Sequence, residues 1–255
     1  MSSQILTIAY YTLLEALRNR LSWAIIFIAI VGLGLSGFLN ELAITESAEI
    51  QIALLASFLR FAAVFLLATF VLTSMIREFN DKVLELLMAS SLPRAAYFLG
   101  KFSGFAVLAV IPSLLFGALI AVLASPLQSL LWTITLVCEL WLIAAFSLLC
   151  VFTFNQVILA LGAVMAFYLM ARSVVTLQLI GQHPLGAQLS SQQVINRMID
   201  LLSALLPHLD SYTRTDWLVY GSGSWSVLPA LLMQTLVYLG LLLGAALFDL
   251  YRKNF

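Results

Sequence analysis

Three charged side chains stand inside long apolar stretches of the chain, where ionised groups are unusual: Arg60, Glu139 and Arg172. A charge that faces lipid is costly, so such residues usually point inward and pair with one another. Counted along helices, each lies about 12–15 Å below the same end of the apolar stretches. We therefore predict one charge cluster, in which Glu139 pairs with one or both arginines. Two roles remain open. The cluster could stabilise the bundle, because removing one partner leaves the other charge unpaired, or it could gate a passage or bind cargo.

The sequence offers no nucleotide-binding motif for catalysis by this chain. A phosphate-binding loop needs a glycine-rich turn that ends in Gly-Lys-Ser/Thr and opens a helix after a strand. Gly100 and Lys101 are followed by Phe102, Ala95 stands where the first glycine is required, and no strand is predicted before them. We predict that this chain is not an enzyme and holds no cofactor.

The cysteines and histidines do not predict a disulfide, a metal site or a protease. Cys138 and Cys150 lie in one apolar run, about 18 Å apart along a helix. That separation is beyond disulfide reach, and neither cysteine pairs with His183 or His208 at a spacing typical of zinc sites. An intramembrane serine protease would need a histidine within the bilayer, and both histidines fall outside the apolar segments.

The composition is that of an integral membrane protein. Of the 255 residues, 63% are hydrophobic and 9% are charged, whereas soluble domains average roughly 25% charged residues. The 12 basic and 12 acidic residues balance, so net charge does not indicate a nucleic-acid partner. A helix needs about 20 apolar residues to cross the hydrocarbon. Six segments qualify: 21–39, 52–76, 102–124, 129–152, 156–180 and 227–248. The predicted fold is an all-α polytopic membrane protein, with one transmembrane domain over residues 1–255.

The basic residues predict the orientation of the bundle. Six spans place both termini on one side, and that side carries most of the flanking basic residues: Arg18, Arg20, Arg77, Lys82, Arg94, Lys101, Arg252 and Lys253. The opposite side holds only Arg197 and Arg214. Because cytoplasmic loops carry the excess of lysine and arginine, we predict that both termini are cytoplasmic.

Two amphipathic segments accompany the spans. Residues 3–20 predict a helix along the inner membrane interface, with Arg18 and Arg20 near anionic lipid headgroups. Residues 194–206, within an extracytoplasmic segment over 181–226, repeat apolar side chains at helical spacing. We expect this second helix to lie on the outer leaflet or to cap the bundle, and a substrate gate is the alternative.

Small residues predict close helix contacts at two places. Gly100 and Gly104 are four residues apart at the start of the third span, and Gly240 and Gly244 repeat this spacing in the last span. Such pairs allow two helix backbones to approach closely. We expect these contacts to form within one subunit rather than between two subunits.

The loop over residues 77–101 predicts a short helix that docks onto another protein. Asn80 or Asp81 can cap this helix, and Pro93 ends it. One face of the helix is apolar: Leu84, Leu87 and Met88. A helix of two to three turns is not stable alone, and a solvated turn would not need an apolar face. The alternative is that the loop only reverses the chain between two spans.

This loop resembles that of the ABC-2 family of ABC-transporter permeases. Members typically carry an acidic residue, a helix with paired leucines, a turn with proline and arginine, and a Leu-Gly-Lys ending. The corresponding residues here are Glu78, Val83-Leu84-Glu85-Leu86-Leu87, Leu92-Pro93-Arg94 and Leu99-Gly100-Lys101. The similarity extends to the N-terminal helix, the six-span plan and the outer stretch over 206–221. Ser91 and Val83 stand where many members have proline and threonine.

The resemblance implies a transport subunit with ATPase partners. The loop would be a coupling helix seated in a groove of an ABC ATPase dimer, which would hold ATP and magnesium. The coupling residues would be Glu78, Asp81, Leu84, Glu85, Leu87, Met88, Arg94 and Lys101. A second copy of the chain would complete a homodimer in the bacterial cytoplasmic (inner) membrane. Export of an amphiphile, such as a lipid, a glycolipid or a drug, would be its activity.

Other functions stay open at this point. An ATPase-coupled mechanical or signalling protein, or a membrane complex that matures a metalloenzyme, would use the same coupling loop without moving bulk cargo. A secondary transporter would be expected to show inverted repeats and broken helices at mid-membrane, and we recognise neither in the sequence.

Overall fold

The computed structural model describes residues 2–19, 21–42, 47–81, 93–154, 156–182 and 190–252, and every regular element in these ranges is helical. The elements are α1 (Ser2–Arg18), α2 (Leu21–Leu42), α3 (Ser47–Asn80), α5 (Arg94–Leu123), α6 (Pro126–Thr153), α7 (Val157–Gln182), α8 (Ser190–Leu205), η1 (Leu209–Ser211), α9 (Thr215–Tyr220), η2 (Trp225–Val227) and α10 (Leu228–Arg252).

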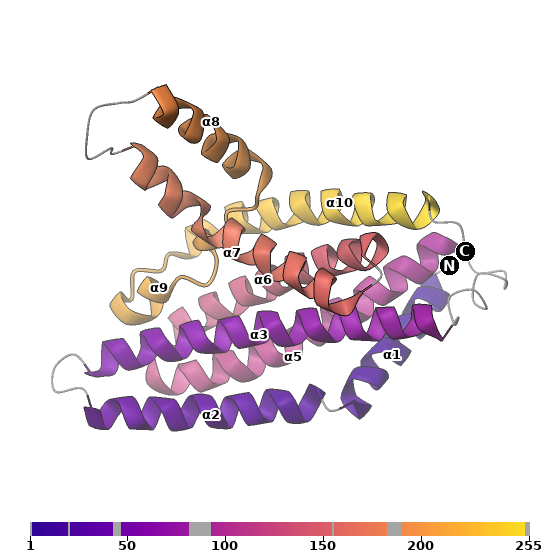
Figure 1. Cartoon of the computed structure of the whole chain (residues 1–255). Helices are drawn as coiled ribbons and strands as arrows, with labels where there is room; N and C mark the ends of the chain where they lie inside the picture. Colours follow the sequence, from indigo (N-terminus) through magenta and orange to yellow (C-terminus); the bar gives the residue numbers. More distant parts are fainter. Residues whose placement is uncertain are drawn as a thin grey trace.

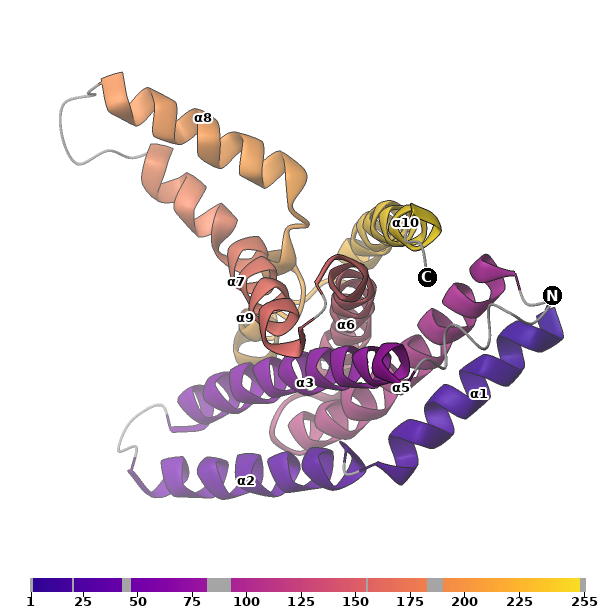
Figure 2. The same cartoon turned by 45° about the vertical axis from the view of Figure 1, so that its right-hand side comes forward.

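Six helices in the described part of the chain are long and apolar enough to cross a membrane: α2, α3, α5, α6, α7 and α10. They run lengthwise through the bundle (Figures 1 and 2). The six predicted spans are thereby confirmed. The division near residues 153–156 is confirmed as well, because α6 ends at Thr153 and α7 begins at Val157.

The helix α3 is longer than its predicted apolar span of residues 52–76. Its 34 residues correspond to about 51 Å of helix, whereas the hydrocarbon core of a bilayer is about 30 Å thick. The helix α3 is therefore longer than the hydrocarbon core is thick, and turns at its ends extend beyond that core. One of these ends carries Arg77 and Glu78.

The two ends of the bundle differ in which helix ends and chain termini lie there. Both chain termini lie at one end, together with the end of α3 and the start of α5, and this end is termed the terminal face (Figure 1). The opposite end, with α8, α9, the end of α2 and the start of α3, is termed the distal face. The excess of basic residues predicts that the terminal face lies in the cytoplasm.

The helix α6 forms the centre of the bundle. It packs against α3, α5, α7 and α10, and large apolar side chains along it are buried: Trp132, Leu136, Leu140 and Leu148. A helix that is apolar on all sides is stable only when other helices or lipid surround it. Because neighbouring helices surround α6, a charged side chain on it is inside the protein and away from lipid.

The predicted outer amphipathic helix is present as α8. It packs mainly against the end of α7, and the two helices project together from the distal side of the bundle (Figures 1 and 2). Apolar side chains of α8 are exposed: Met198, Leu201, Leu202 and Leu205. Of the two expected placements, capping of the bundle is not observed, since α8 packs against α7, and a position on the outer leaflet stays a prediction.

The two glycine pairs behave differently in the structure. A Cβ atom placed on Gly100 would lie 2.8 Å from the Cβ of Ile8, and one on Gly104 would lie 2.7 Å from the Cβ of Thr12. The pair on α5 therefore forms the contact with α1, as expected for packing within one subunit. At Gly240 and Gly244 of α10, no heavy atom of another described element lies within 4 Å of such a Cβ. The intrachain contact expected for this second pair is wrong.

We expect Gly104→Ala to destabilise the chain, because its new methyl group would also lie 3.0 Å from the backbone oxygen of Ala9. Backbone cannot move aside cheaply, and overpacking of this kind costs about 1–3 kcal/mol. Gly244→Ala is the matched control, since alanine favours a helix by about 1 kcal/mol and meets nothing there. Thermal unfolding in detergent should show a lower midpoint for the first variant only. Equal midpoints would contradict the α1–α5 contact.

Candidate functional site

Six polar side chains from α1, α3 and α5 meet at the terminal face and are termed the terminal cluster: Glu15, Ser74, Arg77, Glu78, Tyr97 and Lys101. On α3, Arg77 and Glu78 lie three and four residues after Ser74, and on α5 Lys101 lies four residues after Tyr97, so each helix presents its members on one side. Three belong to the last turns of α3 and two to the first turns of α5. The cluster therefore lies beside both ends of the loop over residues 82–92.

Within the terminal cluster, Glu78 joins the end of α3 to the start of α5. Its carboxylate accepts hydrogen bonds from the Lys101 ammonium and from the Tyr97 hydroxyl. The Lys101 residue is only 5% exposed, and an ammonium at such depth needs a partner because desolvation is costly. The structure thus brings together two of the predicted coupling residues, one from each side of the loop.

Glu15 connects α1 to the end of α3 and the start of α5. The Ser74 hydroxyl donates to its carboxylate at 2.9 Å, the Arg77 guanidinium forms an ion pair with it, and the Lys101 ammonium lies 3.9 Å away. Sequence reasoning placed Glu15 on the polar face of the N-terminal helix and did not connect it with the loop. Its partners lie 59 to 86 residues further along the chain, so no local pattern indicates the contact.

Of the other predicted coupling residues, Asp81 and Arg94 belong to the described part of the chain. Asp81 is exposed at the end of α3, where its amide donates to the Arg77 carbonyl at 2.9 Å. Arg94 donates to the carbonyls of Leu250 and Tyr251 at 3.4 and 3.3 Å, and thereby links α5 to the last turn of α10. Carbonyls at a helix C-terminus lack intrahelical partners and attract cations. The remaining coupling residues lie outside the described part of the chain: Leu84, Glu85, Leu87 and Met88.

A second group of polar side chains, termed the distal cluster, lies between α3, α6, α7 and the segment after α8: Arg60, Thr135, Glu139, Arg172 and Thr213. Glu139 projects from α6 and is fully buried. A guanidinium nitrogen of Arg172 lies 3.4 Å from its carboxylate, and the Thr213 hydroxyl donates to the other carboxylate oxygen at 2.6 Å. The predicted pairing of Glu139 with an arginine is observed for Arg172.

Thr213 connects α3 and α6 within this cluster. Its amide donates to the Thr135 hydroxyl at 3.2 Å, its hydroxyl donates to Glu139, and its carbonyl accepts from Arg60 at 3.2 Å. The residue has a φ of 44°, a conformation that a β-branched residue adopts only when its surroundings enforce it. The three hydrogen bonds hold Thr213 in this conformation inside the bundle.

The two arginines of the distal cluster are bound differently. Arg60 reaches the Thr213 carbonyl instead of Glu139, and its buried Nε has no hydrogen-bond partner among the described residues. Arg172 donates to the carbonyl of Leu209 at 2.8 Å in addition to its contact with Glu139. Both guanidiniums therefore donate hydrogen bonds to backbone carbonyls, and Arg172 also contacts the Glu139 carboxylate.

The segment over residues 209–213 was missed as part of this site by sequence reasoning. Tyr212 holds it to α10, because its hydroxyl donates to the Leu231 carbonyl at 3.0 Å and lies 2.9 Å from the Thr235 hydroxyl. Burial raises the pKa of Tyr212 to about 12, so the hydroxyl stays protonated and remains a donor. A threonine and a tyrosine in a polar stretch carry no signal of such burial.

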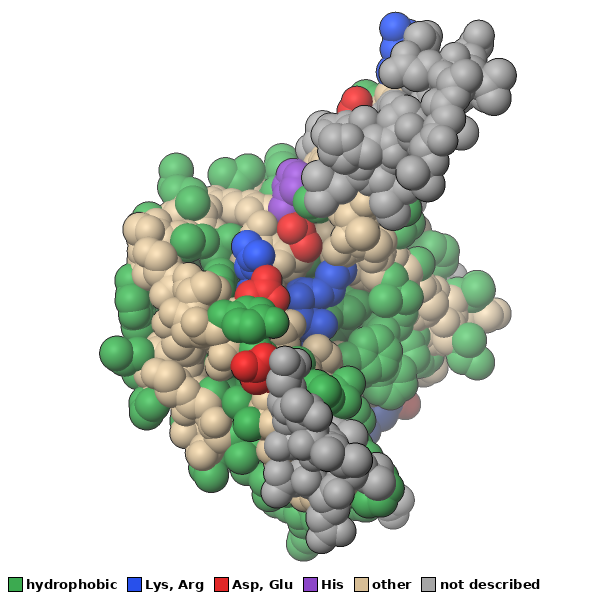
Figure 3. All heavy atoms as spheres, turned by 90° about the vertical axis from the view of Figure 1, so that its left-hand side faces the viewer, with side chains coloured by type: hydrophobic (Ala, Val, Ile, Leu, Met, Phe, Trp, Pro, Cys, Tyr) green, Lys and Arg blue, Asp and Glu red, His purple; other side chains and the backbone are tan. Residues whose placement is uncertain are grey.

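The surface above the distal cluster is polar. Figure 3 shows acidic, basic and histidine side chains gathered near the middle of the distal face. In the segment after α8, Arg214 and Asp216 form an ion pair of 3.0 Å in which both side chains are more than half exposed. Exposed pairs contribute little to stability. The buried contacts beneath are therefore what fastens this segment to the bundle.

The described residues contain no group of three or more His, Cys, Asp or Glu side chains that could hold a metal ion. Both clusters instead connect helices that are distant in the sequence. The terminal cluster joins α1, α3 and α5, and the distal cluster joins α3, α6 and α7 to the segment after α8. This arrangement can transmit a displacement at either face of the bundle to several helices together.

Comparison with known families gives one match. The sequence model of the family described as ABC-2 family transporter protein matches residues 39–248, which is most of the chain. The match includes the loop over 82–92, the four complete spans α3, α5, α6 and α7, most of α10 and the distal segment. No curated protein sequence matches the chain.

Proposed function

The chain belongs to the ABC-2 family of transporter proteins, and we propose that it is the membrane subunit of an ATP-driven exporter of amphiphilic molecules. Six membrane-spanning helices are appropriate for such a subunit. The sequence lacks a phosphate-binding loop, so in this proposal a separate ABC ATPase dimer binds and hydrolyses ATP. The excess of basic residues on the terminal side supports docking of the ATPase on the cytoplasmic face.

The observation that carries the proposal is the link between the two sides of the loop over residues 82–92. Glu78 at the end of α3 binds Lys101 and Tyr97 at the start of α5, and Glu15 ties α1 to the same place. A push on the loop would therefore move the three helices as a unit instead of bending the loop alone. Arg94 would extend this motion to α10.

The packing of the bundle favours a pathway between two copies of the chain. The interior of the six-helix bundle is filled by side chains of α6, including fully buried Trp132 and Leu140. Cargo could pass through this centre only if the core were unpacked, which is costly at protein packing density. We therefore propose a homodimer, with the two subunits moving against each other when the ATPase subunits close.

The proposal predicts that Lys101→Met uncouples ATP hydrolysis from transport. The complex with its ATPase would be purified through a tag on this chain and reconstituted into liposomes with fluorescent lipid, glycolipid and drug analogues. Wild-type complexes should move at least one analogue only when ATP is present. In the variant, ATP hydrolysis should persist while movement falls at least about tenfold, a loss of roughly 1.4 kcal/mol in coupling.

A double variant separates coupling from folding. Lys101→Met alone leaves the Glu78 carboxylate without its ion-pair partner, whereas Glu78→Gln with Lys101→Met removes both charges and should restore stability. Transport should stay low in both variants because the link between α3 and α5 is missing in both. If the chain alone moved the analogues at the wild-type rate, without ATPase and ATP, the proposed function would be wrong.

A further inference from the structure

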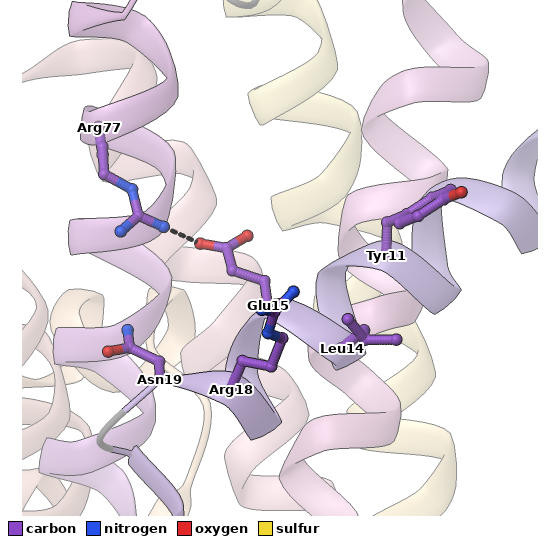
Figure 4. A pocket seen from close by; sticks show the side chains of 6 residues that line it. All are labelled: Tyr11, Leu14, Glu15, Arg18, Asn19 and Arg77. Atoms are coloured by element: carbon purple, nitrogen blue, oxygen red, sulfur yellow. Dashed lines mark hydrogen bonds and ion pairs between the residues drawn. The ribbon is translucent and has the colours of Figure 1, made fainter.

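A pocket of about 390 Å³ opens at the terminal face between the end of α1 and the end of α3 (Figure 4). We propose that it is a binding site for the headgroup of an anionic phospholipid. Four lining residues come from α1, one directly follows it and one comes from α3: Tyr11, Leu14, Glu15, Arg18, Asn19 and Arg77. This inference requires only that the chain spans a membrane, so it stands apart from the proposed transport function.

The charges of the pocket favour a negatively charged ligand. Arg18 and Arg77 face it from two helices, and Glu15 is the one carboxylate in its lining. Glu15 is already engaged by Arg77, by the Ser74 hydroxyl and by Lys101 at 3.9 Å. Within the described residues, no carboxylate lies within 4 Å of the Arg18 guanidinium. The lining therefore has one positive charge in excess.

Donor groups remain available on both guanidiniums. A guanidinium has five N–H donors, and Arg77 is bound to Glu15 through one of its terminal nitrogens. Its side chain is 57% exposed, so other N–H groups can reach a ligand in the pocket. Arginine binds phosphate oxygens with paired, charge-assisted hydrogen bonds. Two arginines from different helices match a phosphate group better than a carboxylate, because phosphate offers more oxygens as acceptors.

The position of the pocket indicates a lipid rather than a soluble phosphate compound. It lies where α1 leads into the first span at Leu21, close to large aromatic side chains that are mostly exposed. Tyr11 of the lining is 65% exposed, and Trp23 at the start of α2 is 75% exposed. Tyrosine and tryptophan gather at the headgroup level of membranes. A phosphate bound between Arg18 and Arg77 would thus have its acyl chains beside the apolar surface of α2.

Native mass spectrometry of the purified full-length chain tests the site with dioleoyl phosphatidylglycerol, dioleoyl phosphatidylcholine and glycerol 1-phosphate as probes. The wild type should retain phosphatidylglycerol in preference to phosphatidylcholine. Arg18→Gln should weaken phosphatidylglycerol binding about fivefold, the loss expected for one basic residue near an anionic headgroup. Glu15→Gln should strengthen it, since the competing carboxylate is removed.

The control is Arg252→Gln, which removes an exposed arginine from the same face outside the pocket. It should leave lipid retention unchanged. Equal losses in Arg18→Gln and Arg252→Gln would indicate diffuse attraction and overturn the proposal. Glycerol 1-phosphate binding as tightly as the lipid would make the pocket a site for soluble phosphate compounds. Equal retention of both lipids by the wild type would show that the pocket does not select an anionic headgroup.

Discussion

Replacing Glu139 with glutamine should lower the stability of the chain by about 3 kcal/mol, the low end of the range for breaking a buried ion pair. Glu139 is fully buried, and the glutamine amide oxygen could still accept the Thr213 hydroxyl. The variant would nevertheless leave the Arg172 guanidinium without its ion-pair partner. The midpoint of thermal unfolding in detergent measures the effect.

Two further variants show whether the ion pair is the cause. Glu139→Gln combined with Arg172→Gln removes both charges and should recover much of the lost stability, because a missing buried pair costs less than a broken one. Glu49→Gln changes an exposed acid at the start of α3 and should alter stability by less than about 0.5 kcal/mol.

The same variants distinguish the two roles that the sequence left open for the distal cluster. Lower stability in Glu139→Gln with recovery in the double variant supports a structural role. Normal stability with lost transport would instead support gating or cargo binding. If stability and transport were both unchanged, neither role would hold, and the burial of Glu139 in α6 would need another reason.

Leu87→Asp should abolish copurification of the ATPase with this chain. The apolar face of the predicted loop helix, with Leu84, Leu87 and Met88, would be buried against the ATPase. A carboxylate at such a position loses its hydration without gaining a partner. Buried anchor residues of interfaces contribute about 2 kcal/mol or more, so affinity should fall at least about 30-fold. Pull-down through a tag on this chain, followed by quantification of the bound ATPase, measures the loss.

Leu86→Asp provides a matched control in the same loop. Leu86 lies next to Leu87 in the sequence, but on a helix with 3.6 residues per turn it points about 160° away from both Leu84 and Met88. It should retain the ATPase, since the new carboxylate would face water. Equal losses in both variants would indicate that aspartate disrupts the helix itself, and an undiminished complex with Leu87→Asp would refute docking through this face.

The spans and their division follow from the local order of residues. Long apolar runs specify helices in lipid because each backbone group must be bonded within its own segment. The polar residues Thr153 and Gln156 divide what would otherwise be one run of nearly fifty residues. The structure places the break there, between α6 and α7. The amphipathic helices at the N-terminus and after α7 follow from periodicity in the same way, and both are present as α1 and α8.

The pairings within the two clusters do not follow from local order. The buried charge of Glu139 predicts that an arginine pairs with it, but not that Thr213 would join the pair from a segment outside the spans. In the sequence, Glu15 is one of several polar residues on an interfacial helix. Its contacts with Arg77 and Ser74 exist only because α3 lies beside α1. In both cases the partner is chosen by how helices pack, and many packings satisfy the same sequence pattern.

The two glycine pairs illustrate where the sequence by itself reaches its limit. It determined six helices long and apolar enough to cross a membrane, with charged residues inside them, since hydrophobicity and periodicity act within single segments. Only the tertiary structure decided that Gly100 and Gly104 contact α1 while Gly240 and Gly244 have no described neighbour. Identical spacing permits close approach in both helices, but the neighbour that approaches depends on the shapes of the whole bundle.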